Sequence, residues 1–366
     1  MGAKPLKTQP GKILPFNTIR VEAELSKYPI HNLDKGSTAV EIQIVKKNDH
    51  GEVTLQWLVS HSSRYGQPGQ LAYKIDTLVI NRRLDESGRP LPKCIRLGSL
   101  RQIASDVGVG EKNTGSVKKA LRQNAHTGIT AKLFYRDLEG GERKFEGDFH
   151  RYSVVFTGET LPDGQKADAV YLVFNDIYRK FLNNSLTRPL DYDYLKVLSP
   201  TAQRLYEIVS YQVFAALKHN LPYAKMRYSD WCLYSARQRY FKRKKMLDQM
   251  RKIHHPHLES GYFTEINYQE TVDAEGNPDW YICYTPGGKA RNEYNTFNNK
   301  RQKVIEIERV DSSWEQGDFL QEDRRAVSSM ELDPEEEYTP TDVKEFQRSL
   351  FWDLVSGVSE KLSKMS

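Results

Sequence analysis

The sequence predicts an α+β fold in which two consecutive units share one order of elements and a polar tail follows them. A helix-turn-helix pattern followed by extended segments occupies 95–175, and the same order of helices and strands recurs in 199–285. Beyond Pro286 the sequence becomes polar and then acidic. With 366 residues the chain is longer than one average domain, so two domains with tails are expected.

The first unit is predicted to begin with a β-hairpin and a helix. Apolar and polar residues alternate in 40–45 and in 53–58, on either side of a turn at Asn48–Gly51. After a Gly- and Pro-containing loop, the apolar residues of 71–82 recur at helical spacing.

A helix-turn-helix follows. Its first helix has four apolar residues on one face, namely Leu100, Ile103, Ala104 and Val107. Gly108 is predicted to end that helix, and Asn113 or Thr114 to cap a second one that reaches Asn124. The second helix carries three basic residues opposite its apolar face, Lys118, Lys119 and Arg122.

Extended segments complete the first unit. Strands are predicted at 131–135, 151–157 and 168–175, with a charged, Gly-rich connection at 137–148. This order, two helices followed by a β-wing, is that of a winged helix.

The second half repeats this order. Ser199 and Pro200 open a long helix, a shorter one follows at 228–236, and a basic helix is predicted from Arg237 to Lys252. Strands at 262–269 and 279–285 form a hairpin around a turn at Asp273–Asn277. The predicted fold is therefore two tandem winged-helix domains with a partly disordered C-terminal tail.

The basic helix separates its residues into an apolar face and a cationic face. The cationic face contains Lys242, Lys244, Lys245, Gln249, Arg251 and Lys252. Only Asp248 interrupts these cations, whereas a solvated helix usually mixes signs to form i,i+4 pairs. A solvent-exposed lysine face is one interpretation, and a polyanionic partner that relieves the repulsion is the other.

The position of this helix favours DNA, because the recognition helix of a helix-turn-helix enters the major groove. Arg237 and Arg239, near its N-terminus, are predicted to read guanine O6 and N7. The phosphate contacts are predicted at Lys242, Lys244, Lys245, Arg251 and Lys252. In the first unit Lys118, Lys119 and Arg122 are predicted to contact DNA, with dimerisation as the competing use of that domain.

Catalysis, metal binding and cofactor binding are not expected. The cluster His254, His255 and His257 has a metal-binding or nuclease interpretation, but no carboxylate-rich motif accompanies it, and capping of the basic helix is the preferred one. Neither a phosphate-binding Gly loop nor a nucleophile elbow occurs. We therefore expect no enzyme activity, no cofactor and no metal.

Composition indicates a cytoplasmic protein. The mean hydropathy is −0.68, and no apolar run reaches bilayer length or resembles a secretory signal. Cys94, Cys232 and Cys283 are far apart and read as reduced thiols. The net charge is only +6, but acidic residues are concentrated in 315–337, so the body of the chain is more basic than the whole.

The expected domains are a flexible N-terminus (1–14), a first winged-helix domain (15–195), a second one (196–286), a polar and acidic linker (287–340) and an amphipathic C-terminal segment (341–366). In the last segment five apolar residues share one helical face, Val343, Phe346, Leu350, Leu354 and Val358.

Dispersed patterns between residues 14 and 285 resemble the replication initiator protein A family of bacterial plasmids. They comprise Leu25–Lys35, Gly66–Asp76, Ile95–Leu121, Leu198–Tyr206 and His257–Phe263. The resemblance implies a tandem winged-helix protein that binds repeated double-stranded sites (iterons) at an origin and recruits the host helicase and chromosomal initiator. It implies that 237–252 lies in the major groove of the iteron. It also implies that 113–124 either contacts the other half of the DNA site or mediates homodimer formation.

The tail also resembles a known motif. The stretch from Gln347 to Phe351 is similar to the pentapeptide by which bacterial replication proteins bind the sliding clamp. By that resemblance the clamp contacts would come from Gln347, Ser349, Leu350 and Phe351, while Arg348 stands where leucine is preferred. A docked terminal helix is the alternative. Two other functions stay open for the whole chain: a transcriptional repressor of the same fold, and a rolling-circle DNA nickase.

Overall fold

The computed structural model describes residues 17–34, 41–48, 50–138 and 140–298, which form a mixed α/β protein. Its strands are β1 (Thr18–Glu22), β2 (Ile42–Lys47), β3 (Val53–Ser60), β4 (Cys94–Gly98), β5 (Gly128–Arg136), β6 (Glu142–His150), β7 (Tyr152–Val155), β8 (Val170–Phe174), β9 (Thr187–Asp191), β10 (Ala224–Arg227), β11 (Phe263–Val272) and β12 (Pro278–Pro286). The α-helices are α1 (Gln70–Lys74), α2 (Asn81–Ser87), α3 (Leu100–Asp106), α4 (Thr114–Ala125), α5 (Asp176–Asn184), α6 (Tyr192–Val197), α7 (Pro200–Lys218), α8 (Tyr228–Tyr234) and α9 (Arg243–Glu259). A π-helical turn, Ile75–Ile80, joins α1 to α2, and a 3₁₀ turn spans Leu25–Lys27.

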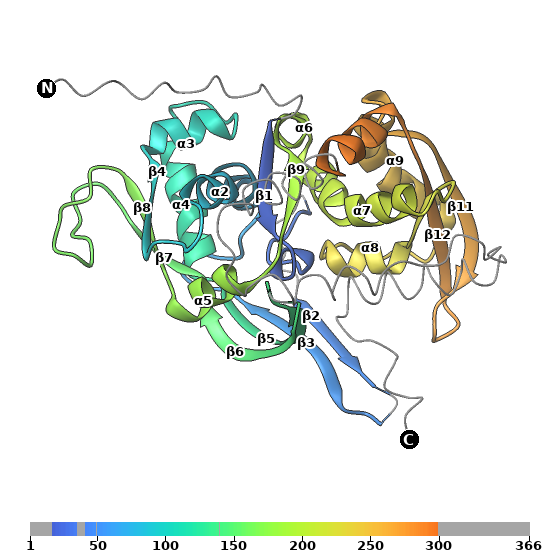
Figure 1. Cartoon of the computed structure of the whole chain (residues 1–366), viewed down its shortest axis with the longest axis horizontal. Coiled ribbons are helices and arrows are strands. Elements are labelled where there is room, and N and C mark those ends of the chain that lie inside the picture. The colour runs from blue at the N-terminus through green and yellow to red at the C-terminus, as the bar shows by residue number, and fades with distance from the viewer. Residues whose placement is uncertain (1–16, 35–40, 49, 139, 299–366) are drawn as a thin grey trace, which may run out of the picture.

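Figure 1 shows two bodies side by side, with the pair β1 and β9 between them. The first body contains α1 to α4 and a three-stranded sheet of order β4-β8-β7. Ser99 caps α3 by accepting the N–H of Gln102 at 3.1 Å, and Gly108 follows with a φ of +72°. The predicted helix-turn-helix is confirmed, because α4 begins directly after Asn113.

The predicted charged connection at 137–148 is wrong in part. Residues 142–150 form β6, which pairs with β5 along its whole length, and the two strands extend the hairpin of β2 and β3 into a sheet of order β2-β3-β5-β6. Most of β6 is exposed, so its sequence lacks the apolar alternation that marks a half-buried strand. The first unit therefore has an additional sheet, of which β5 and β6 lie between α4 and β7 in the sequence.

The second body consists of α7 to α9 and a sheet of order β10-β12-β11. In both bodies a helical segment is followed by a strand, two helices and two further strands, with β5 and β6 inserted before the last two strands of the first body. In each three-stranded sheet the last strand in sequence lies in the middle. The strands of the last hairpin turn at Asp273–Asn277, as predicted. The two bodies thus share connectivity as well as element order.

The boundary between the units differs from the one predicted at 195. Ile19 and Val21 of β1, Leu190 of β9 and Leu195 of α6 all pack in the core of the second body. Because β1 and β9 pair with each other and bury apolar side chains against α7, segments on both sides of the first unit belong to the second core.

The basic helix begins later and ends later than predicted. Ala236 has a φ of +50°, a conformation that interrupts a helix, and α9 starts only at Arg243. It runs through Pro256 to Glu259, because that proline lies in the last turn and removes only one hydrogen bond, to the carbonyl of Lys252. Arg237 and Arg239 are therefore not on the helix.

The linker prediction for 287–340 is wrong at its start. Residues 288–298 are helical, and Ala290 and Glu293 in them are buried. The rest of that linker, the segment 341–366, the clamp-motif residues Gln347, Ser349, Leu350 and Phe351, and the N-terminus 1–14 lie outside the described residues. None of the helices described here has the length and apolar composition needed to cross a bilayer.

Candidate nucleic-acid interface

The cationic face of α9 is open to solvent. Met246, Met250 and Ile253 are buried on its other side. The exposed residues include six cations, Lys242, Arg243, Lys244, Lys245, Arg251 and Lys252. Five of them are predicted contact residues, and Arg243 is an addition that the sequence interpretation missed, although it lies within the same basic run.

The N-terminus of α9 adds to this positive potential. It has no acidic residue in its first turn and no side-chain cap, so backbone N–H groups remain without intrahelical partners there. The helix dipole places about half a positive charge at the same end. Phosphate oxygens are well suited to this combination of backbone donors and lysines.

Few carboxylates offset these cations. Arg243 lies 3.6 Å from Glu270 and Arg251 lies 3.7 Å from Asp248, and both pairs are exposed. Within the described ranges, no carboxylate oxygen lies within 4.0 Å of the ammonium groups of Lys242, Lys244 or Lys252. Exposed pairs of this kind are weak, so most of the charge of α9 remains available to a ligand.

Arg237 and Arg239 are engaged within the protein. Arg237 forms an ion pair with Asp34 at 3.0 Å and donates to the carbonyl of Leu33. Arg239 lies 2.7 Å from Asp273 in the wing turn and also donates to the carbonyl of Pro278. A guanine contact by Arg239 would require release of the Asp273 carboxylate, so these contacts favour a bracing role for the segment before α9.

The loop before α9 is also fastened to the helix. The Tyr228 hydroxyl accepts the backbone N–H of Tyr240 at 3.1 Å and donates to Gln249 Oε1 at 2.7 Å. The Gln249 amide then donates to the carbonyl of Gln238 at 3.0 Å. Gln249, which the sequence places on the cationic face, therefore holds the loop in position.

The hairpin of β11 and β12 in the second body is acidic. Its exposed residues include Glu265, Glu270 and Glu275, and Asp273 occupies the turn. Neither strand of this hairpin carries a lysine or an arginine. Phosphate contacts from the hairpin are thus disfavoured, and α9 is the cationic element of this body.

In the first body α4 presents a smaller basic surface. The Lys118 ammonium lies 4.5 Å from the ring centroid of Phe156, and the Arg122 guanidinium lies 5.4 Å from the same ring. Lys119 is exposed. Two of the three predicted residues therefore pack over an aromatic ring, where cations are partly satisfied.

The histidines do not cap α9 but lie within its last two turns. His254 has both ring nitrogens in hydrogen bonds, to Tyr284 Oη at 3.2 Å and to Tyr268 Oη at 3.0 Å. His257 Nε2 donates to the carbonyl of Ala202, so in the neutral ring Nδ1 carries no proton. Nδ1 therefore accepts from the Tyr194 hydroxyl at 2.6 Å. The described residues contain no cluster of three or more side chains able to hold a metal.

Burial of these histidines predicts a pH dependence of stability. Desolvation lowers the pKa of His254 from 6.5 to about 3 and that of His257 to about 4. Between these values and 6.5 the unfolded chain is protonated and the folded chain is not, so unfolding takes up protons and stability falls as the pH is lowered. Each histidine should reduce the folding equilibrium constant by up to about tenfold per pH unit below 6.

Urea unfolding between pH 7 and pH 5 measures this slope. His254→Gln should reduce the slope whatever it does to stability at pH 7, while the matched change His255→Gln, at a residue whose side chain is 67% exposed, should leave it unchanged. An identical slope in wild type and His254→Gln would contradict the assignment.

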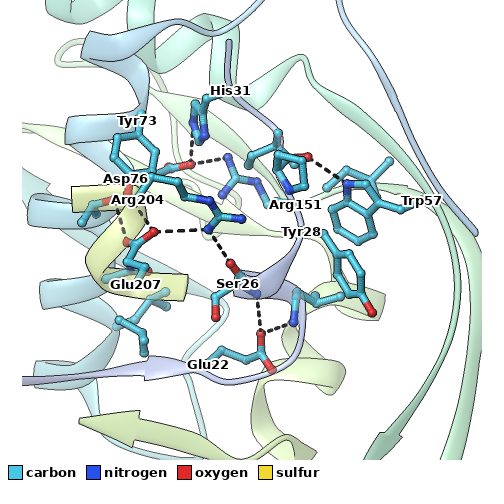
Figure 2. Close-up of a pocket in the computed structure, with 18 of the residues that line it drawn as sticks. Glu22, Ser26, Tyr28, His31, Trp57, Tyr73, Asp76, Arg151, Arg204 and Glu207 are labelled. Atoms are coloured by element: carbon cyan, nitrogen blue, oxygen red, sulfur yellow. Dashed lines mark hydrogen bonds and ion pairs between the residues drawn. The ribbon is translucent and has the colours of Figure 1, made fainter. Parts of the chain in front are cut away.

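A buried polar network begins at α4 and the π-helical turn. Asp76 accepts from Arg151 at 2.6 Å, from the Tyr152 hydroxyl at 3.0 Å and from the Asn124 amide of α4 at 3.1 Å. His31 lies 3.1 Å from the same carboxylate (Figure 2). Burial alone would raise the pKa of Asp76, but Arg151 and these hydrogen bonds hold it below its ordinary value.

A second buried group joins the two bodies. Glu207 of α7 accepts from the Tyr73 hydroxyl of α1 at 2.7 Å and lies 3.3 Å from Arg204. Arg204 also donates to the carbonyl of Ser26 (Figure 2). It donates as well to the carbonyls of Lys27 and of Tyr234, the last residue of α8. A cavity of roughly 100 Å³ lies between these side chains. The polar contacts therefore extend from α4 to the end of α8, immediately before the loop that leads to α9.

Sequence reasoning missed this network because its members are distant in sequence. Asp76 and Arg151 are separated by 75 positions, and Tyr73 and Glu207 by 134. The available signal was polar residues on otherwise apolar helical faces: Asp76 lies between Ile75 and Leu78, and Glu207 beside Tyr206 and Val209.

Comparison with solved structures gives distant likenesses, of which one is described here. A solved structure described as the Pi initiator protein in complex with iteron DNA is similar to 63% of this chain and 98% of its own, with a TM-score of 0.38 and 9% identity. A TM-score and an identity this low assign neither a fold nor a function to the chain. No family model matches the sequence, and neither does any curated protein.

Proposed function

We propose that this protein is a sequence-specific double-stranded DNA binder made of two winged-helix units, and that it initiates plasmid replication by binding repeated sites at an origin. The observation that carries the proposal is the open cationic face of α9, the third helix of a unit of helix, strand, two helices and a hairpin. Recognition helices occupy this position in winged-helix proteins.

The dimensions of α9 suit the major groove. Its 17 residues make a rod of roughly 25 Å, and the groove, about 12 Å wide, admits one helix. Lys242, Lys244 and Lys245 at the N-terminal end would contact phosphates, with Arg251 and Lys252 two turns further along. Among the cations Arg243 is the candidate for base contact that replaces Arg237 and Arg239, since its ion pair with Glu270 is exposed and weak.

The two units would act together. In the first unit α4 would contact an adjacent part of the site through Lys119, with Lys118 and Arg122 beside it. The contacts of Glu207 with Tyr73 and of Arg204 with the carbonyls of Ser26 and Lys27 support a fixed orientation of the two units. Bending a site costs about 1–6 kcal/mol, which phosphate contacts from two rigidly joined units can offset.

Initiation by binding alone is the form of the proposal, with host replication proteins as partners and no catalytic step. The resemblance of several segments to plasmid initiators supports it over a repressor of the same fold. The nickase alternative gains no support from His254 and His257, because all four of their ring nitrogens are used in hydrogen bonds within the core.

Selection of bound duplexes from a random library, followed by footprinting on the DNA that flanks the gene, tests the proposal. Enrichment of one motif that recurs as direct repeats beside an A·T-rich tract would support an initiator. A single palindrome over a promoter would favour the repressor instead. Failure to enrich any motif would sink sequence-specific binding, and a covalent adduct with supercoiled plasmid and magnesium would sink initiation by binding alone.

The proposal extends to the sliding clamp through Gln347, Ser349, Leu350 and Phe351. A labelled peptide of residues 345–353 should bind a purified bacterial clamp in fluorescence polarisation. Joint replacement of Leu350 and Phe351 with alanine should weaken it by tenfold or more, since each apolar side chain contributes about 1.5 kcal/mol or more when buried. A peptide that does not bind, or that binds equally well after the replacement, would remove the clamp from the list of partners.

A further inference from the structure

The sequence beyond the described residues contains a strongly acidic stretch. Acidic residues are concentrated in 315–337, and within it the acidic segment 331–337 has five of them in seven positions, Glu331, Asp333, Glu335, Glu336 and Glu337. No lysine, arginine or histidine lies between Arg325 and Lys344. The carboxylates of the acidic segment therefore have no cation close to them in the sequence to relieve their mutual repulsion.

The cationic face of α9 has the opposite charge and few partners of its own. Among the described residues, the carboxylates within 4.0 Å of its cations are those of Glu270 and Asp248. The first turn of the helix has neither a side-chain cap nor an acidic residue, although carboxylates are favourable at this end of a helix. In the described part of the chain this face is thus unpartnered, and it suits carboxylates as well as phosphates.

The chain leaves the described structure on the same body as α9. Ala290, in the helix 288–298, packs in one apolar core with Met246 and Met250 of α9. From residue 298 to residue 331 there are 33 positions, which span at most about 120 Å. This is more than four times the length of α9, about 25 Å, so the acidic segment is able to reach the whole cationic face.

The acidic segment also matches this face in length and is present at high local concentration. Seven residues span at most about 25 Å, which is the length of α9. Exposed ion pairs are individually weak, so a free peptide of this sequence would bind weakly. A segment joined to its target by a linker that can span the distance has an effective concentration of up to about a millimolar. Several weak pairs are then sufficient to occupy the face.

We propose that the acidic segment 331–337 binds the cationic face of α9 within the same chain, and that it competes there with polyanions for Lys242, Lys244 and Lys245. The contact between the segment and the helix does not depend on the proposed function, whereas its competition with DNA rests on that function. Because the contact is ionic and exposed, it weakens as the salt concentration rises.

Zero-length cross-linking of the full chain with a carbodiimide, at about 50 mM salt and without DNA, tests the contact. The reagent joins a carboxylate only to an amine that touches it. Unlabelled and nitrogen-15-labelled chains are mixed, cross-linked and digested, and the linked peptides are identified by mass spectrometry. We expect links from the acidic segment to Lys242, Lys244 or Lys245 in which both peptides carry the same isotope, and we expect them to be lost at about 500 mM salt.

Lys180, an exposed lysine of α5, is the control amine. Absence of links to α9, or links to α9 that are no more frequent than those to Lys180, would overturn the proposal. Linked peptides that combine the two isotopes would also overturn it, because they would place the segment of a second copy on α9.

Joint replacement of Glu335, Glu336 and Glu337 with glutamine tests the competition. The affinity of the full chain for duplex DNA at about 50 mM salt should rise by about three- to tenfold, the value of three exposed ion pairs. The matched control makes the same change in net charge at three exposed glutamates of the first body, Glu41, Glu52 and Glu142, and should change the affinity by less than about twofold.

The gain should shrink when Lys244 and Lys245 are alanine, because the segment then loses its partners on α9. Equal affinities of the two glutamine variants would overturn the competition. Cross-links to α9 in a chain that binds no duplex would refute the proposed function and still support the contact, so the two failures are distinguishable.

Discussion

Joint replacement of Lys244 and Lys245 with alanine is expected to weaken binding to every duplex by about a hundredfold at moderate salt. Each lysine is exposed in the first turn of α9, beside backbone N–H groups without helical partners. A charge-assisted hydrogen bond to a phosphate contributes about 1.5 kcal/mol or more, which is about tenfold for each lysine. The loss should be uniform across sequences because phosphates carry no base identity.

Fluorescence anisotropy between 50 and 300 mM salt measures this effect. The slope of log affinity against log salt should become smaller by about two, since each phosphate contact contributes about 0.9. Lys180→Ala, at an exposed residue of α5, is the matched control and should change neither affinity nor slope. Unchanged binding in the double variant would refute the assignment of α9.

The second large effect is expected from Asp76→Ala. The substitution leaves the Arg151 guanidinium buried without its carboxylate partner, and it also removes the acceptor used by Tyr152 and Asn124. Breaking a buried ion pair by removing one partner costs about 3–5 kcal/mol. The free energy of unfolding by urea should fall by that amount.

Two variants separate this cost from a general effect of mutation. Asp168→Ala breaks an ion pair with Arg96 in which both side chains are more than half exposed, and it should change stability by less than 1 kcal/mol. Joint replacement of Asp76 with leucine and Arg151 with methionine should recover much of the loss, because no unpaired charge remains. An Asp76→Ala protein as stable as wild type would mean that the network is not a structural element.

Local signals predicted much of the fold. Gly108 marked the end of α3, Asn113 marked the start of α4, and the Asp273–Asn277 turn marked the last hairpin. These features depend on residues adjacent in sequence, whose backbone preferences act before any packing. The cationic face of α9 was equally predictable, because Lys244 and Lys245 lie opposite Met246 and Met250 at helical spacing.

Features that depend on tertiary contacts were predicted less well. The start of α9 is fixed by the fastening of the loop through Tyr228 and Gln249. The helix at 288–298 begins at Gly288, directly after Gly287. Two adjacent glycines indicate a linker unless the burial of Ala290 in the second core is known. Arg239 looked like a free cation because its partner, Asp273, lies 34 positions away.

The acidic hairpin gives the second body an electrical polarity. The hairpin carries Glu265, Glu270 and Glu275, while five exposed cations lie on α9 and a sixth, Lys242, directly precedes it. The hairpin therefore repels a polyanion and α9 attracts it. Fields of this kind orient a protein during diffusion, before any contact is made. For the proposed DNA ligand, electrostatic repulsion by the hairpin would disfavour encounter complexes in which the hairpin approaches first. Encounter complexes in which α9 faces the DNA would be favoured.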